Sequence, residues 1–312
     1  MSCLHLKHLS VAFETSMGKV VAVDDVSLDH EMKETLALVG ETGCGKSIIA
    51  RSILRLLPDN AHLSGQILYR ERDLLRLSER ELADIRGQEI AIIFQNPTLA
   101  LNPVYRIGDQ IAELFKIHKK ASSKKSMEYA LSLLGRMGFE NPEHALHMYP
   151  SQLSEGMNQR VLIALAIALH PKIIVADEPT KGLDARLKED ILIELREIKQ
   201  EKESSLFLIT HDLEAAQSIA DRLALMYCGQ IVETALSMDF FEEPFHPYGR
   251  ALLRSLPAHG FAPIAGASPS MISPPMGCRF HPRCEERLDV CGREAPPPID
   301  KSGRTVRCHL YR

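Results

Sequence analysis

Residues 40–47 read Gly-Glu-Thr-Gly-Cys-Gly-Lys-Ser, a complete GxxxxGK(S/T) phosphate-binding loop. The apolar run at residues 36–39 precedes this loop, and the helix-like segment SIIARSILRLL follows from Ser47. In such a strand-loop-helix setting, backbone N–H groups converge on phosphate, Lys46 adds a positive charge, and the Ser47 hydroxyl reaches Mg²⁺. The sequence therefore predicts an α/β fold that holds a nucleoside triphosphate at this loop.

Two further apolar runs end in residues that suit phosphate hydrolysis. The run at 173–176 leads into Asp177 and Glu178. At the end of a parallel strand, Asp177 is expected to reach the Mg²⁺ shell and Glu178 to act as general base on the attacking water. The run at 206–210 leads into His211, whose imidazole is expected to sense the γ-phosphate. A histidine in this place also suits a purely structural role.

Two more motifs lie between the loop and the acidic pair: FQNP at residues 94–97 and LSEGMNQR at residues 153–160. With them the chain resembles the ATP-binding cassette ATPases from about residue 4 to residue 310. The resemblance implies that Gln95 is the catalytic Q-loop glutamine, which also reaches Mg²⁺, and that His211 is the switch histidine. It further implies ATP and Mg²⁺ as cofactors and a P-loop NTPase core with an N-terminal antiparallel β-subdomain.

The same resemblance assigns the remaining site residues. Phe13 is expected to stack on adenine, although a phenylalanine on an N-terminal strand also suits the core. In a nucleotide-sandwich dimer, the signature motif at residues 153–157 and the D-loop at residues 183–184 face the nucleotide of the partner. The ATP-binding set is Phe13, Gly40, Glu41, Thr42, Gly43, Cys44, Gly45, Lys46 and Ser47, and the set that faces the partner's nucleotide is Ser154, Glu155, Gly156, Met157 and Asp184.

Three features depart from the cassette pattern or carry unusual chemistry. Glu155 occupies the place of the first glycine in the usual Ser-Gly-Gly, and its carboxylate either repels phosphate or turns to solvent. Residues 180–184, Thr-Lys-Gly-Leu-Asp, differ from the common Thr-Thr-Ala-Leu-Asp. Cys44 is next to a helix N-terminus and Lys46, so the pKa of its thiol is expected to be lowered.

Composition limits the kind of protein. The 312 residues, 45% of them hydrophobic, suffice for one large core and a smaller module. The longest strictly apolar run, Val161–Leu169, has nine residues, whereas a membrane span needs about 20. Residues 1–11 lack the apolar core of a signal peptide, and a formal charge of -4 does not indicate nucleic-acid binding. We expect a peripheral subunit on the cytoplasmic face of the membrane.

The chain is expected to contain an ATPase domain at residues 1–256, with a helical subdomain inserted at about residues 96–155. The segment FHPYGRALL, at residues 245–253, is similar to the one that follows the cassette in dipeptide and oligopeptide permease ATPases. Residues 257–277 contain five prolines and predict an extended linker. Residues 278–312 then form a small cysteine module, which we expect to be energetically separate from the nucleotide site.

Four of the seven cysteines crowd into the last 35 residues: Cys278, Cys284, Cys291 and Cys308. Their spacing has no CxxC pair, which fits zinc ribbons poorly, and disulfides do not suit a reducing cytosol. The resemblance to peptide-permease ATPases implies that they bind a [4Fe-4S] cluster, with zinc or an empty reduced thiol cluster as alternatives. This segment carries eight Lys and Arg against five Asp and Glu, which either offset the cluster charge or form a solvated surface.

The resemblance implies an ATP-hydrolysing subunit of a binding-protein-dependent importer for dipeptides or oligopeptides. Its expected partners are a second, paralogous ATPase subunit, two transmembrane permease subunits and an extracytoplasmic solute-binding protein. A nickel or metal-chelate importer is the alternative within the class. A soluble cassette ATPase of DNA repair or translation is expected to carry a coiled-coil insertion or a second cassette, and the sequence shows neither. A redox-sensing regulatory protein is a third alternative.

Overall fold

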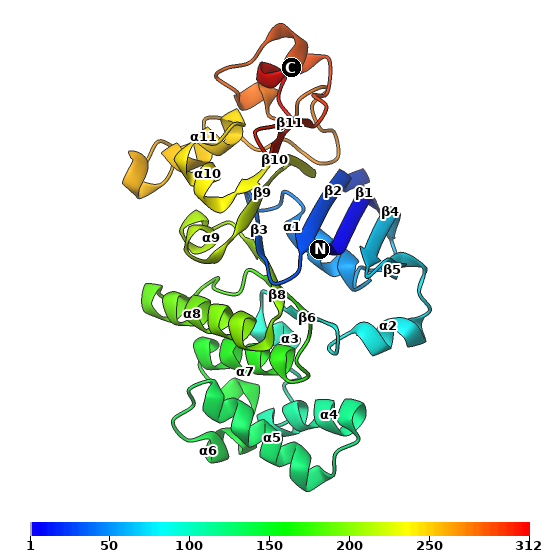
Figure 1. Cartoon of the computed structure of the whole chain (residues 1–312), viewed down its shortest axis with the longest axis vertical. Helices are drawn as coiled ribbons and strands as arrows, with labels where there is room; N and C mark the ends of the chain where they lie inside the picture. The colour runs from blue at the N-terminus through cyan, green and yellow to red at the C-terminus, as the bar shows by residue number, and fades with distance from the viewer. Residues whose placement is uncertain (1) are drawn as a thin grey trace. The chain divides into compact units, whose positions relative to one another are not determined.

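The structure, a computed structural model, describes residues 2–312 (Figure 1). The chain forms two compact units: Met1–Leu77 together with Leu208–Arg312, and Ser78–Phe207. Strand β8, Ser205–Thr210, runs across the boundary between them. The first unit is therefore assembled from two distant stretches of sequence.

The N-terminal part of the first unit is a four-stranded sheet in the order β2-β1-β4-β5. Every neighbouring pair in this sheet is antiparallel. Alternating burial along β2 points one set of side chains into the core and the other to solvent, as a half-buried strand requires. This sheet confirms the predicted antiparallel β-subdomain. Its strands are β1 (Ser2–Thr15), β2 (Gly18–Glu31), β4 (Ala61–Tyr69) and β5 (Arg72–Asp73).

The second group of strands in the first unit carries the nucleotide-loop segment. Strand β3 (Thr35–Val39) is fully buried and pairs in parallel with β9 (Arg222–Tyr227). Beyond β9 the pairing turns antiparallel, through β10 (Gln230–Leu236) to β12 (Arg304–Val306) and β11 (Ile299–Lys301). The helices of this unit are α1 (Lys46–Ile53), α9 (Leu213–Ile219), α10 (Ser237–Glu242) and α11 (Pro247–Arg254).

The C-terminal segment shares the core of the first unit. Phe280 is 2% exposed and belongs to the buried cluster built from β3, β9, β10 and α11. Its ring meets Tyr227 edge-on at 5.2 Å and lies 5.3 Å from Tyr248. Cys278 and Cys284 pack against the same cluster. The cysteine segment is thus joined to the nucleotide-loop unit by packing and by the β12 to β10 pairing, while its expected energetic separation from the nucleotide site stays a prediction.

The second unit combines two parallel strands with helices. Strand β6 (Ile90–Ile93) pairs with β7 (Ile173–Asp177). Helix α7 is largely buried, as expected from its second half, which is continuously apolar from Val161. The region at about residues 96–155, for which the sequence predicts helices, contains α4, α5 and α6. The helices are α2 (Glu79–Ile85), α3 (Pro97–Ala100), α4 (Ile107–Lys119), α5 (Ser123–Arg136), α6 (Pro142–His147), α7 (Glu155–Ile167) and α8 (Ala185–Lys202).

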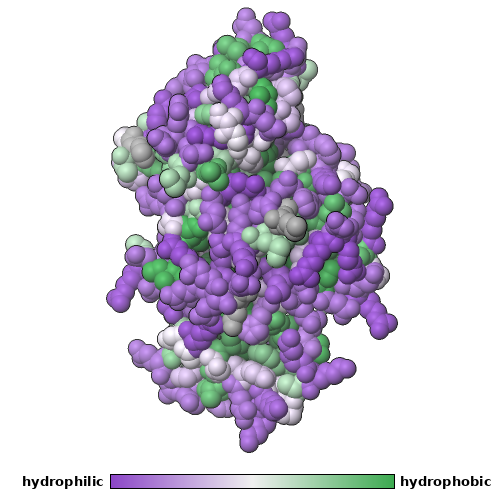
Figure 2. All heavy atoms as spheres, viewed as in Figure 1, coloured by the Kyte–Doolittle hydropathy of each residue, from purple (hydrophilic) through white to green (hydrophobic). Residues whose placement is uncertain are grey.

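The surface is mainly hydrophilic on the face shown in Figure 2, where hydrophobic side chains form small separate patches. Within residues 2–312, no helix combines the length and the apolar character that a membrane span needs.

Candidate functional site

The phosphate-loop residues form a tight turn between β3 and α1. Gly45 is the N-cap of α1 in the left-handed region, with φ 111°. A Cβ on Gly45 would lie 2.2 Å from the Ala22 carbonyl oxygen, so only glycine fits there. No side chain caps α1 and no acidic residue lies in its first turn. The first amides of this helix therefore face an electrostatic setting that suits an anion.

Lys46 is the first residue of α1 and is 5% exposed. Its Nζ donates hydrogen bonds to the carbonyl oxygens of Gly40, at 2.8 Å, and Glu41, at 2.9 Å. The ammonium group thus lies against two carbonyl oxygens of the loop, and its contact with phosphate stays a prediction. Ser47 follows on the same turn of the helix.

Cys44 does not behave as the sequence predicted. The loop buries this thiol, and burial raises its pKa to about 11. The positive charge of Lys46 acts in the opposite direction but is the smaller effect. The expected thiolate is therefore wrong, because removal of water destabilises a charged sulfur more than the neighbouring lysine stabilises it.

In the second unit, Asp177 is the last residue of β7 and is 1% exposed. Glu178 follows with φ 50°, a left-handed conformation that is unfavourable for a non-glycine residue. Such strained positions cluster at active sites, where the surrounding structure maintains them. The backbone thus turns sharply at the end of β7, where the two acidic residues lie. Gln95 follows β6 and is half-buried.

The signature and D-loop residues start helices in this unit. Ser154 caps α7 by accepting a hydrogen bond from the Met157 N–H at 3.2 Å, and Asp184 caps α8. Glu155, the first residue of α7, is exposed. A Cβ added to Gly182 would lie 3.1 Å from Glu155 Oε1. The Glu155 carboxylate therefore lies beside the turn that leads to the D-loop of its own chain.

The structure gathers residues 40–47 into one loop in the first unit, which also contains His211 directly after β8. Phe13 lies on β1 opposite Val20 and Ala61 and is half-buried. Gln95, Asp177, Glu178, Ser154, Gly156 and Asp184 belong to the second unit. The approach of the two sets to one nucleotide stays a prediction of the cassette resemblance.

The four C-terminal cysteines line one small cavity together with His246, Phe280 and His309. Burial, with a smaller contribution from the neighbouring cysteines, raises the pKa of Cys278 and of Cys308 to about 11. Within residues 2–312, no three or more Cys, His, Asp or Glu side chains stand at metal-ligand geometry. The sulfurs are gathered at one place without forming a ready coordination sphere. The four residues are Cys278, Cys284, Cys291 and Cys308.

Sequence reasoning missed the contacts between the phosphate loop and the C-terminal third of the chain. The Glu41 carboxylate binds Arg283, and the Glu41 N–H donates to the Tyr248 hydroxyl at 2.9 Å. Tyr248 belongs to the HPY segment, whose resemblance was the only signal available for it.

Comparisons with known proteins agree with this arrangement. Residues 23–181 match the family described as ABC transporter, and residues 232–291 match the oligopeptide/dipeptide transporter C-terminal region. The chain is 43% identical to the dipeptide transport ATP-binding protein DppD of Bacillus subtilis, covering 98% of this chain and 94% of that protein. It is 36% identical to the oligopeptide transport ATP-binding protein OppD of Escherichia coli, covering 98% and 92%.

A solved structure of a dimeric ATP-binding cassette, bound to ADP and phosphate after hydrolysis, is similar to this chain. The TM-score is 0.67 at 27% sequence identity, and the match covers 75% of this chain and 98% of that chain. This similarity confirms the predicted P-loop NTPase fold of the cassette type.

Proposed function

Because this chain belongs to the ATP-binding cassette family of transporter ATPases, we propose that the ATP it hydrolyses powers the import of dipeptides or oligopeptides. The observation that carries the substrate class is the match of residues 232–291 to the oligopeptide/dipeptide transporter C-terminal region. Relatives named for dipeptide and oligopeptide transport match nearly the whole chain, which supports the same class.

We assign the nucleotide site to the phosphate loop and the acidic strand end. Lys46 and the amides of α1 bind the phosphates, and Phe13 stacks on adenine. Ser47, Gln95 and Asp177 hold Mg²⁺, which supplies neutralisation of charge on the phosphate oxygens. Glu178 orients the attacking water and accepts its proton as the water oxygen bonds to the γ-phosphorus. ADP then leaves with the β–γ bridging oxygen, while His211 donates a hydrogen bond to the γ-phosphate.

The remaining motifs face a second ATPase subunit. Ser154 and the N–H groups at the start of α7 contact the partner's γ-phosphate, and Asp184 lies near the same nucleotide. Closure of the two subunits around ATP drives two permease subunits between access states, and an extracytoplasmic binding protein delivers the solute. Glu155 brings a negative charge to this set, which supports unequal activity of the two ATP sites in a heterodimer. The complex operates at the cytoplasmic face of the membrane.

We assign a [4Fe-4S] cluster to the four C-terminal cysteines. Four thiolates suit this cluster, and the cysteines line one cavity. His246 also fits, since its ring is 1% exposed and its Nδ1 accepts the Tyr248 N–H at 3.0 Å. The proton of the neutral ring is then on Nε2, for which residues 2–312 provide no hydrogen-bond partner. Since His246 lines the cavity, this N–H suits a sulfur acceptor. Bound there, the cluster supplies a cross-link that holds the segment together.

Reconstitution tests the function. This chain is assembled with the permeases, the second ATPase and the binding protein in liposomes, and ATP hydrolysis is measured with peptides of different length. We expect peptide-loaded binding protein to stimulate hydrolysis and nickel chelates to have no effect. Stimulation by nickel chelates alone identifies the metal importer instead. Equal hydrolysis with and without permeases indicates a cassette ATPase that does not serve transport.

A further inference from the structure

Arg283, the residue before Cys284, reaches the phosphate loop. Its Nη1 lies 3.0 Å and 2.9 Å from the two carboxylate oxygens of Glu41. The Arg283 side chain is 7% exposed and that of Glu41 is 23% exposed, so water screens this ion pair little. The two residues are 242 positions apart in sequence, yet both belong to the first unit.

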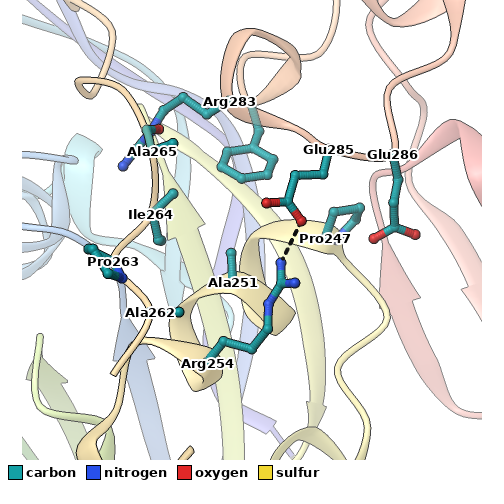
Figure 3. A pocket seen from close by; sticks show the side chains of 11 residues that line it. Pro247, Ala251, Arg254, Ala262, Pro263, Ile264, Ala265, Arg283, Glu285 and Glu286 are labelled. Carbon is teal, nitrogen blue, oxygen red and sulfur yellow. Dashed lines mark hydrogen bonds and ion pairs between the residues drawn. The ribbon is translucent and has the colours of Figure 1, made fainter. Parts of the chain in front are cut away.

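The guanidinium group of Arg283 is held from several directions. Its Nε donates to the Ala265 carbonyl oxygen at 3.0 Å, and its Nη1 lies 3.3 Å from the Tyr227 hydroxyl. Figure 3 shows Arg283 running alongside Ala265 at one side of a cavity, which the Arg254–Glu285 ion pair crosses. Because its other hydrogen bonds fix its position, Arg283 meets Glu41 in one defined geometry.

Glu41 connects this contact to the phosphate-binding lysine. Its carbonyl oxygen accepts from Lys46 Nζ at 2.9 Å, and its N–H donates to the Tyr248 hydroxyl at 2.9 Å. The Ser268 hydroxyl from the proline-rich stretch also donates to its carboxylate. One residue of the loop therefore touches α11, the proline-rich stretch, the cysteine segment and Lys46.

The charge of Glu41 makes this contact relevant to nucleotide binding. A carboxylate in a loop that binds a triphosphate places like charges close together, and their repulsion is strong where water is partly excluded. Arg283 supplies the opposite charge at hydrogen-bonding distance. Removal of Arg283 would leave the Glu41 carboxylate half-buried and negative, with the Ser268 hydroxyl still donating to it but without an opposite charge beside it.

We propose that Arg283 is a positioning residue for ATP binding, which neutralises and holds Glu41 and so makes the affinity of the phosphate loop dependent on an ordered cysteine segment. The inference rests on the proposed nucleotide site at residues 40–47. It adds a long-range connection: a change in the cysteine segment reaches Lys46 through Arg283 and Glu41.

The test compares Arg283→Ala with Arg254→Ala in the full-length protein with its native metal content. Arg254 lines the same cavity but pairs with Glu285 instead of the loop, so it is the matched control. We expect Arg283→Ala to raise the Kd for ATP, measured by calorimetry, and the KM of the assembled transporter by about tenfold. The kcat is expected to change little, and Arg254→Ala is expected to stay near wild type. Arg283→Lys keeps the charge but loses the Nε hydrogen bond to Ala265, so its Kd for ATP is expected between those of wild type and Arg283→Ala.

Repeating the test in the Glu41→Gln variant distinguishes loss of the Arg283–Glu41 ion pair from general loosening of the cysteine segment. In Glu41→Gln protein the carboxylate is gone, so adding Arg283→Ala is expected to leave the Kd for ATP where Glu41→Gln alone puts it. An equal tenfold loss in both backgrounds, or no loss in either, overturns the proposal. Lys46→Ala tests the nucleotide site independently of the Arg283 proposal. If Lys46→Ala leaves ATP binding unchanged, the assignment of the site to residues 40–47 is itself wrong.

Discussion

The phosphate loop and the cysteine segment obtain their shape in opposite ways. The loop is determined by its neighbours in sequence: β3 ends at Val39, Gly45 turns the chain, and α1 begins at Lys46. The cysteine segment has only short turns and the three-residue strands β11 and β12. It depends on distant partners, among them Tyr227 and Tyr248 around Phe280. The functional loop is local, but the surroundings that complete it are not.

The largest expected effect is on ATP hydrolysis, whose general base lies in neither the phosphate loop nor the cysteine segment. Glu178→Gln is expected to lower ATP turnover of the assembled complex by about 10² to 10⁴, because an amide cannot accept the proton of the attacking water. ATP binding should persist, since the phosphate loop is unchanged, and calorimetry with the same variant checks this. Turnover near the wild-type rate would show that Glu178 is not the general base.

The dependence of the cysteine segment on distant partners is tested by Phe280→Ala. Deleting this buried ring is expected to cost about 3–5 kcal/mol of unfolding free energy. Chemical denaturation measures the loss, and Leu310→Ala, at a side chain that is 38% exposed in the same segment, is the control with a small effect. Equal destabilisation by both variants would mean that the segment does not depend on the shared core.

A smaller effect is expected when a change in the cysteine segment alters ATP binding at the phosphate loop. Cys284→Ser is expected to reduce the iron content and to expose residues 278–312 to protease, because one of four ligands is lost. Since Arg283 is the adjacent residue, we also expect the Kd for ATP to rise several-fold, by up to about tenfold. Iron analysis, limited proteolysis and calorimetry are made on one anaerobic preparation. Loss of iron with an unchanged Kd would show that the loop is independent of the segment.

The smallest effect concerns Cys44 within the local region. Its thiol pKa of about 11 leaves only about 10⁻³ of it as thiolate at pH 8. Iodoacetamide should therefore label Cys44 very slowly at pH 8, and about tenfold faster for each added pH unit until the pH approaches the pKa. Mass spectrometry of the peptide that contains Cys44 follows the rate. Rapid labelling at pH 7 would restore the thiolate that the sequence predicted.

The sequence predicted the features that depend on residues close together in the chain. The glycines of the loop, the apolar strands before it and before Asp177, and the periodic helices α4 and α5 were all predictable, because the residues concerned are neighbours. Cys44 was predicted wrongly for the same reason: Lys46 is visible beside it, whereas the burial that dominates its pKa comes from the folded surroundings. The Arg283 contact with Glu41 joins residues with no pattern in common, so no periodicity or spacing reveals it.

The two-part construction of the first unit also sets an order of events during synthesis. The phosphate loop leaves the ribosome early, but Arg283 is made 242 residues after Glu41, roughly 10 to 50 s later at ordinary rates of translation. During that interval the Ser78–Phe207 unit is produced in full, and β9 and β10 follow it, whereas β12 is made only after Arg283. The nascent chain therefore completes its nucleotide unit only at the end of translation, and a chain truncated before Arg283 lacks one partner of its phosphate loop.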